Sequence, residues 1–390
     1  MRPRAPARVL VAPASTQRIP VGPRPIRLSA VLSRYLARQV LIGIAIAVFG
    51  LAVIAFVADV VELLRRAYGQ PGVSLGLVLL MGLLHLPFLV QKLMPFAVLF
   101  GTMLTFQRLT RSHELVAARS AGVSIWQFLL PALLVAQVIG IFTLVAFNPL
   151  ASVLMARYEA LQQKYLSQDS DLITVGQGGL WLRQTREGGG ELLLHARQMH
   201  PDTGRLDQVV VLEFAADGTF ASRIDAALAY LRPGYWELST PLLSDRDGES
   251  RIVPDIRLPT DLTGHRIQDS FAAPETLSFW DLPGFVQELE AVGFSAREHR
   301  LYWQGLLALP LLLSAMLLIG TTSSLRLVRR GGVGLLITAG LVTGFLFYIL
   351  SDVVFAIGLS GRLPAILAAW SPAGIAVLLG CTTLLHLEDG

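Results

Sequence analysis

The chain contains six apolar stretches of membrane-spanning length, three on each side of a more polar insert. A helix needs roughly 20 apolar residues to cross a hydrocarbon core of about 30 Å. The hydrophobic fraction of 53% and the charged fraction of 15% are also typical of a membrane protein. The stretches lie within 39–58, 67–107, 120–156, 301–325, 331–351 and 363–386. The sequence therefore predicts an α-helical membrane protein with six transmembrane helices.

The insert between the third and fourth stretches is acidic and rich in β-strand signals. Residues 157–300 contain 22 acidic and 14 basic residues, a net charge of −8 in a chain of net charge +4, so the rest carries +12. The β-rich segments, separated by turn residues, are 179–184, 191–199, 206–214, 219–231, 235–240 and 251–258. We expect an inserted all-β, jelly-roll-like domain that faces water, which makes the fold α+β overall.

The arginine distribution predicts the orientation of the chain in the membrane. The predicted regions follow from the apolar and β-rich segments described above. Residues 1–38 contain eight arginines and no acid, and six prolines lie in the first 25 positions. Arginine excess marks cytoplasmic segments, so both termini are expected in the cytoplasm and the β-domain in the periplasm of a bacterium. The predicted regions are a disordered arm (1–28), three spans with a short cytoplasmic helix at 111–122 (29–156), the β-domain (157–276), a helical connector (277–300) and three further spans (301–390).

The second apolar stretch is long enough for two spans. Residues 67–107 hold Lys92 as their one charged residue, but no turn residues divide the stretch. A seventh span would also export the arginines at 108–119. We therefore predict one long helix kinked near Pro87 and Pro95.

A short polar segment follows this helix. Ser112 can cap a helix that has Glu114 in its first turn, where the helix dipole favours an acid. Gly122 can end that helix, and Ser124 with Gln127 forms a capping box that opens the third span. The segment is either an interfacial connector or a coupling helix that docks into a cytoplasmic motor.

Several classes of chemistry are excluded or disfavoured. The single Cys381 permits no intrachain disulfide. Neither lysine of the chain, Lys92 or Lys164, follows a glycine, so a Walker-type nucleotide loop is absent. The histidines, including His195 and His200, have no metal-ligand spacing. We expect a protein that is not an enzyme and binds no metal or cofactor.

The chain resembles the lipopolysaccharide-transport permeases LptF and LptG in several short motifs and in their order. The motifs are Leu86–Pro95, Gln107–Val116, Ala121-Gly122, Gln177–Trp181, Ala226–Tyr230 with Trp236, and Phe345–Asp352. The resemblance covers about residues 29–386. The strand at Trp181 and the helix at Tyr348–Asp352 are closer to the LptG branch.

This resemblance implies a half-transporter in the bacterial inner membrane. Such a permease pairs with a homologous permease, and a dimer of a separate ATPase, LptB, binds the ATP. Lipopolysaccharide passes from the membrane to a periplasmic bridge of the LptC/LptA type, and no nucleic acid is involved. The acidic residue of the family's coupling helix, which contacts the ATPase, maps onto Glu114. Its neighbours Arg111, His113 and Leu115 complete the expected coupling segment.

Basic residues at the outer ends of the spans are candidates for binding lipid phosphates. Arg65 and Arg66 follow the first span, where they either snorkel at the headgroups or pair with lipid A phosphates. Family members often carry a further lysine one turn earlier, where this chain has Asp59. The other candidates are Lys92, Arg157 and Lys164.

The fifth span carries the candidate gate residues. Gly340 and Gly344 allow close helix approach, and spans one and five face the partner in this family. Asp352 is an uncommon intramembrane acid that suggests a polar partner or a gate role. His85 in the second span is expected to be a hydrogen-bonded packing residue.

Two other functional classes remain open. An exporter of another envelope lipid or lipoprotein would also use an outer β-domain and a coupling helix. A membrane scaffold or sensor would use the β-domain to bind envelope proteins, but would not require Glu114 on a cytoplasmic helix.

Overall fold

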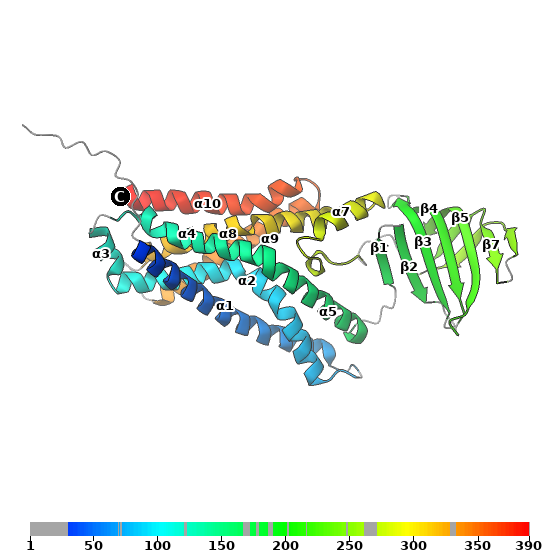
Figure 1. Ribbon diagram of the computed structural model, residues 1–390, viewed down its shortest axis with the longest axis horizontal. Coiled ribbons are helices and arrows are strands. Elements are labelled where there is room, and N and C mark those ends of the chain that lie inside the picture. The colour runs from blue at the N-terminus through cyan, green and yellow to red at the C-terminus, as the bar shows by residue number, and fades with distance from the viewer. Residues whose placement is uncertain are drawn as a thin grey trace, which may run out of the picture.

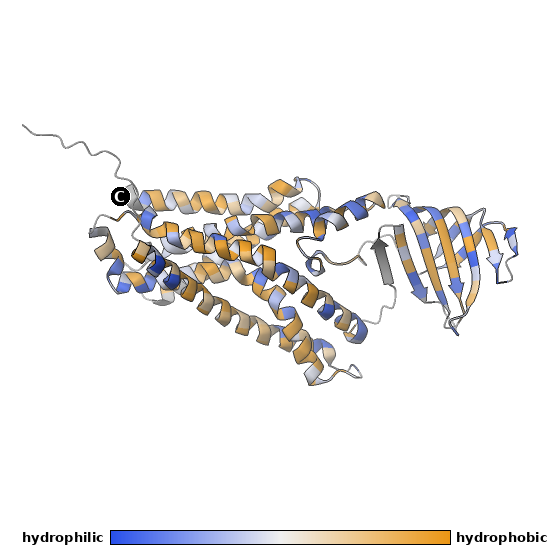
Figure 2. Ribbon diagram, viewed as in Figure 1, coloured by the Kyte–Doolittle hydropathy of each residue, from blue (hydrophilic) through white to orange (hydrophobic). Residues whose placement is uncertain are grey.

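The computed structural model describes residues 30–68, 70, 72–120, 123–166, 172–176, 179–185, 190–200, 203–215, 217–246, 249–260, 271–327 and 333–389. The predicted arm 1–28 and the predicted helix end at Gly122 lie outside these residues. A helical bundle forms one end of the molecule and a β-sheet the other (Figure 1). Figure 2 shows hydrophobic residues along the bundle helices and mixed hydropathy along the strands.

Six helical segments of the described chain are long and apolar enough to cross a membrane. Three precede the β-sheet and three follow it, which confirms the predicted arrangement. The first three are α1 (Ala30–Ala67), α2 (Leu75–Arg111) and the continuous run of α4 (Ile125–Phe142), the π-helical turn η1 (Thr143–Phe147) and α5 (Asn148–Leu166). The last three are α8 (Arg297–Leu327), α9 (Val333–Leu359) and α10 (Ala365–Asp389).

The second span is one unbroken helix, as predicted. Ser74 caps its start, because the Ser74 hydroxyl accepts a hydrogen bond from the Leu77 amide at 3.2 Å. Pro87 and Pro95 lie inside the helix, and each removes one amide donor from the helical ladder. Helix α2 changes direction along its length in Figure 1. At the start of the third span, the Ser124–Gln127 capping box is also confirmed.

Helices α1 and α2 touch backbone to backbone in the N-terminal half of α1. A Cβ atom on Gly101 would lie 2.5 Å from Ile44 Cα, and one on Gly43 would lie 2.7 Å from the Gly101 carbonyl oxygen. The Thr105 hydroxyl donates to that same carbonyl at 2.7 Å. Only glycine permits this approach, because any side chain would push the helix axes apart.

The described strands form one antiparallel sheet of nine strands. Their order is β1-β2-β3-β4-β5-β6-β9, and the β7–β8 hairpin pairs with β5. The first half of the long strand β5 pairs with β7 and the second half with β6, so the sheet forks at this strand. The strands are β1 (Leu172–Gly176), β2 (Gly179–Thr185), β3 (Glu191–His200), β4 (Arg205–Phe214), β5 (Phe220–Arg232), β6 (Tyr235–Ser239), β7 (Leu242–Asp245), β8 (Ser250–Ile252) and β9 (Ile256–Pro259).

The inserted all-β domain is therefore confirmed, and the strands differ from prediction at its two ends. Five of the six predicted segments correspond to β2 to β6. The sixth, 251–258, is divided into β8 and β9 at Pro254, which cannot donate a ladder hydrogen bond. The short strands β1 and β7 were not predicted.

One face of the sheet is apolar, and the connector packs against part of it. Leu192, Leu194 and Ala196 alternate with less buried residues along β3 and belong to the buried core of the domain. After the turn η2 (Pro274–Thr276), helix α7 (Leu282–Ala291) and the residues after it add Leu289, Val292, Phe294 and Ala296 to this core. The Met199 amide donates to the Val292 carbonyl at 3.0 Å, which fixes the connector on β3.

The contact between α1 and α2 predicts that alanine substitution destabilises the protein at one glycine of α2 and not at another. Gly101→Ala should lower the free energy of unfolding by about 1–3 kcal/mol, because the added methyl group meets backbone atoms. Gly76→Ala is the control, because its Cβ would meet no atom closer than 3.9 Å. Thermal unfolding of the detergent-solubilised protein measures both. Equal midpoints for the two variants would contradict the packing described.

Candidate functional site

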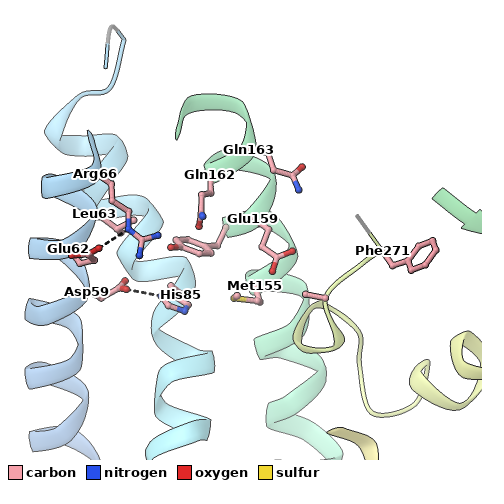
Figure 3. A pocket seen from close by; sticks show the side chains of 12 residues that line it. Asp59, Glu62, Leu63, Arg66, His85, Met155, Glu159, Gln162, Gln163 and Phe271 are labelled. Atoms are coloured by element: carbon pink, nitrogen blue, oxygen red, sulfur yellow. Dashed lines mark hydrogen bonds and ion pairs between the residues drawn. The ribbon is translucent and has the colours of Figure 1, made fainter. Parts of the chain in front are cut away.

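A cavity of about 550 Å³ opens between the C-terminal parts of α1 and α5 and the N-terminal part of α2, with Phe271 and Ala273 from the segment before η2 also in its lining. Figure 3 shows Asp59, Glu62, Arg66 and His85 gathered between α1 and α2. Its lining is mostly polar, with both acidic and basic groups. The lining residues are Asp59, Glu62, Leu63, Arg66, His85, Met155, Tyr158, Glu159, Gln162, Gln163, Phe271 and Ala273.

A hydrogen bond between Asp59 and His85 joins α1 to α2 at the base of the cavity. Asp59 Oδ1 lies 2.9 Å from His85 Nδ1, and each side chain is only 14% exposed. The His85 ring stacks on Tyr158 of α5, with ring centroids 4.5 Å apart. The prediction that His85 is a hydrogen-bonded packing residue is therefore confirmed. The second oxygen of Asp59, Oδ2, is buried without a hydrogen-bond partner.

Glu62 holds both arginines that follow the first span. Its carboxylate lies 2.8 Å from Arg65 Nε and 2.8 Å from Arg66 Nε. Glu62 was not predicted as part of the site, although the i, i+3 and i, i+4 spacings of a helix bring its side chain to Arg65 and Arg66. Both guanidinium groups remain more than half exposed, so the trio presents a net charge of +1 to solvent.

The other predicted basic residues lie away from the cavity lining. Lys92 on α2 and Arg157 on α5 are exposed, and neither lines the cavity. Lys164 is also exposed, and its Nζ lies 5.3 Å from the ring centroid of Tyr165. Of the five predicted cations, Arg66 lines the cavity directly, and Arg65 shares its Glu62 partner.

Acidic and amide groups that the sequence analysis did not identify take part in the lining. Glu159, Gln162 and Gln163 come from one face of α5. Glu159 is the third carboxylate in the lining, beside Asp59 and Glu62. The basic side chains of the lining are Arg66 and His85. Among the residues that the structure describes, no three histidine, cysteine or acidic side chains are grouped to hold a metal ion.

At the end of the bundle away from the β-sheet, Glu114 lies at the start of a short helix (Figure 1). Helix α3 runs from Glu114 to Ser120, so it begins three residues later than predicted, and Arg111 is the last residue of α2. His113 connects the two helices with a φ of +60°. Glu114 is exposed, whereas Leu115 is buried in the core of the bundle. The carboxylate of Glu114 accepts hydrogen bonds from the Tyr35 hydroxyl and the Ser112 hydroxyl, both at 2.8 Å.

The glycines of α9 face α2 within the same chain. A Cβ on Gly340 would lie 2.7 Å from Met103 Sδ, and one on Gly344 would lie 3.0 Å from the Phe96 ring. The predicted close helix approach is therefore made to α2. Asp352 is exposed, and no hydrogen bond or ion pair connects it to another described residue.

The Asp59–His85 contact predicts that a single variant is less stable than the corresponding double variant. His85→Phe keeps the ring stacking but leaves both oxygens of the buried carboxylate unpaired, so it should cost about 1–3 kcal/mol of unfolding free energy. The double variant Asp59→Leu/His85→Phe should recover most of this loss, because no unpaired charge remains. Thermal unfolding measures both variants. A double variant less stable than His85→Phe would disprove the assignment.

Comparison with known proteins gives consistent matches over nearly the whole chain. The family model for the lipopolysaccharide export system permease LptF/LptG matches residues 34–386. The chain is 24% identical over 364 residues to the lipopolysaccharide export system permease protein LptG of Escherichia coli strain K12, covering 91% of this chain and 98% of that protein. It is 20% identical over 365 residues to the LptG protein of Haemophilus influenzae, covering 89% of this chain and 96% of that protein.

The family match spans all six membrane helices, the β-domain and the residues around the cavity. The chain therefore belongs to the LptF/LptG family of lipopolysaccharide export system permeases, and it is a multi-pass inner-membrane protein.

Proposed function

We propose that the chain is the LptG-type subunit of an ABC exporter that takes lipopolysaccharide from the inner membrane and passes it to a periplasmic bridge. A homologous LptF-like permease completes the membrane part, and an LptB-like ATPase dimer supplies the energy. The observation that carries this proposal is the pairing of two features at opposite ends of helix α1. The cavity lies at one end, and the short helix α3, with the exposed carboxylate of Glu114, lies at the other.

The charge distribution supports a periplasmic β-domain and cytoplasmic termini. The insert carries a net charge of −8, whereas the membrane helices and their flanks carry +12. Basic segments stay on the cytoplasmic side during membrane insertion. In this orientation the cavity opens at the outer leaflet and α3 faces the cytoplasm.

The exposed carboxylate of Glu114 supports docking onto a separate ATPase. Glu114 is the acid in the first turn of α3, and Arg108 and Arg111 precede it in the last turn of α2. A carboxylate can accept a bidentate pair of hydrogen bonds from an arginine, which is a strong charge-assisted contact. The chain has no nucleotide loop of the Walker type, so the ATP of this exporter is bound by the partner.

The Glu62–Arg65–Arg66 trio supports recognition of an anionic lipid headgroup. Its exposed guanidinium groups lie at the outer end of α1, and Arg66 also lines the cavity. Lipid A phosphates offer several anionic oxygens, and arginine forks match phosphate geometry. The apolar face of the β-domain is the surface that acyl chains would follow toward an LptC/LptA-like bridge.

A second candidate is an exporter for another envelope lipid. The three carboxylates that face the cavity favour a headgroup that carries an amine as well as a phosphate. The two candidates predict different lipids bound to the same cavity.

Purification of the tagged protein from its native membrane tests the function. We expect an LptF-like permease, an LptB-like ATPase and lipopolysaccharide to accompany the chain, and mass spectrometry identifies all three. A different lipid with the same protein partners would support the second candidate. A chain that carries neither ATPase nor lipid would overturn both and favour a membrane scaffold.

Substitution of Glu114 tests the docking contact. Glu114→Ala should reduce the amount of co-purified ATPase by about tenfold, because a charge-assisted hydrogen bond is worth roughly 1.5–3 kcal/mol. Glu114→Arg should reduce it further through repulsion from a basic groove. Glu298→Gln, an exposed acid in the first turn of α8, is the control. Undiminished ATPase binding and lipid release in both Glu114 variants would refute the contact.

Charge reversal tests the outer basic pair. Arg65→Glu/Arg66→Glu should lower the lipid bound per complex roughly tenfold or more, because each surface cation contributes about 1 kcal/mol toward an anionic headgroup. Arg65→Lys/Arg66→Lys should cost less, since the charges remain. Arg362→Glu, an exposed arginine between α9 and α10, is the control. A full complement of lipid in the double Glu variant would show that these arginines serve only as interfacial anchors.

A further inference from the structure

The cytoplasmic end of α1 is bonded directly to the start of α3. Tyr35 lies in the second turn of α1, and its hydroxyl donates to Glu114 Oε2 at 2.8 Å across 79 positions of sequence. Ser112 donates to the other oxygen, Oε1, at 2.8 Å. The Glu114 carboxylate is therefore held from two sides, by its own connecting segment and by a different membrane helix.

The two hydrogen bonds orient the carboxylate without saturating it. Each carboxylate oxygen has two lone-pair sites. With one hydrogen bond on each oxygen, one acceptor site remains on each, as an arginine fork requires. An oriented acceptor loses less conformational entropy on binding than a freely rotating one. Tyr35 thus prepares Glu114 for a basic partner.

The same two helices also share one buried core. Leu115, the next residue of α3, belongs to the same buried cluster as Leu36 of α1, Leu109 of α2 and Phe128 of α4. Tyr35 and Leu36 are adjacent on α1, as Glu114 and Leu115 are on α3. Helices α1 and α3 are therefore joined by a hydrogen bond and contribute neighbouring residues to one core.

Helix α1 extends from this contact to the cavity. Its 38 residues extend about 57 Å at 1.5 Å per residue. Asp59, Glu62 and Arg66 near its far end line the cavity. Between the two ends, the backbone contact at Gly43 and Gly101 holds α1 against α2.

We propose that Tyr35 is a positioning residue that orients Glu114 and links the motion of α3 to α1, and through α1 to the cavity. This inference rests on the proposed function, because it assigns a role in energy coupling to that same exporter. Loss of the hydroxyl alone should leave the complex assembled but weaken the link between ATP hydrolysis and lipid movement.

The test uses the complete complex in proteoliposomes that contain lipopolysaccharide. Tyr35→Phe should lower the lipid released per ATP hydrolysed by about threefold to tenfold, which matches the net strength of one ordinary solvent-exposed hydrogen bond. Tyr68→Phe makes the same change beyond the other end of α1, at a side chain that is 91% exposed, and should match the parent. The thermal unfolding midpoint of both variants checks that the fold is intact. A parental ratio for Tyr35→Phe would overturn the proposal.

A double-mutant cycle separates this inference from the function on which it rests. In a Glu114→Ala background, Tyr35→Phe should have no further effect, because the two residues act through one bond. If Glu114→Ala itself transports normally, the proposed docking contact fails. A second outcome is that Glu114→Ala impairs transport, while Tyr35→Phe lowers the lipid released per ATP equally in the parent and in the Glu114→Ala background. In that case the docking contact stands and the role of Tyr35 fails.

Discussion

The close contact of α1 and α2 at Gly43 and Gly101 is the constraint on which the rest of the bundle depends. Lipid tails offer no hydrophobic drive for helix association, so packing and polar contacts decide which helices stay together. Here the two helices touch through their backbones at Gly43 and Gly101, and through Asp59–His85 nearer the cavity. At the opposite end of the bundle, α2 leads through Ser112 into α3, which returns to α1 through Tyr35. The three helices are therefore connected to one another along the whole length of α1.

Features with a local or periodic origin could be predicted from the sequence. The six spans follow from apolar length, the capping box from Ser124 and Gln127, and β2 to β6 from strand-rich segments between turns. Strand β1 was missed because a strand of five residues beside the polar linker carries little periodic signal, and β7 because it has only four residues. The long-range pairs have no such signal: Asp59 and His85 are 26 positions apart, and Tyr35 and Glu114 are 79 apart. Glu62 lay within reach of sequence analysis, because its spacing to Arg65 and Arg66 is a local property of a helix.

The cavity wall separates an inward-bonded acid from a solvent-facing charged group. Asp59 lies against His85 of α2, inside the bundle. The Glu62–Arg65–Arg66 trio lies more exposed at the end of α1, and within it one acid offsets one of two bases.

The connector on the β-domain has a consequence of its own. Leu289, Val292 and Phe294 are buried in the core on the apolar face of the sheet. In the proposed export route, an acyl chain on this face would compete with these side chains, which the covalent connection keeps at a high effective concentration. Because α7 is followed directly by α8, a ligand that displaces α7 from the sheet would also shift the N-terminal end of α8.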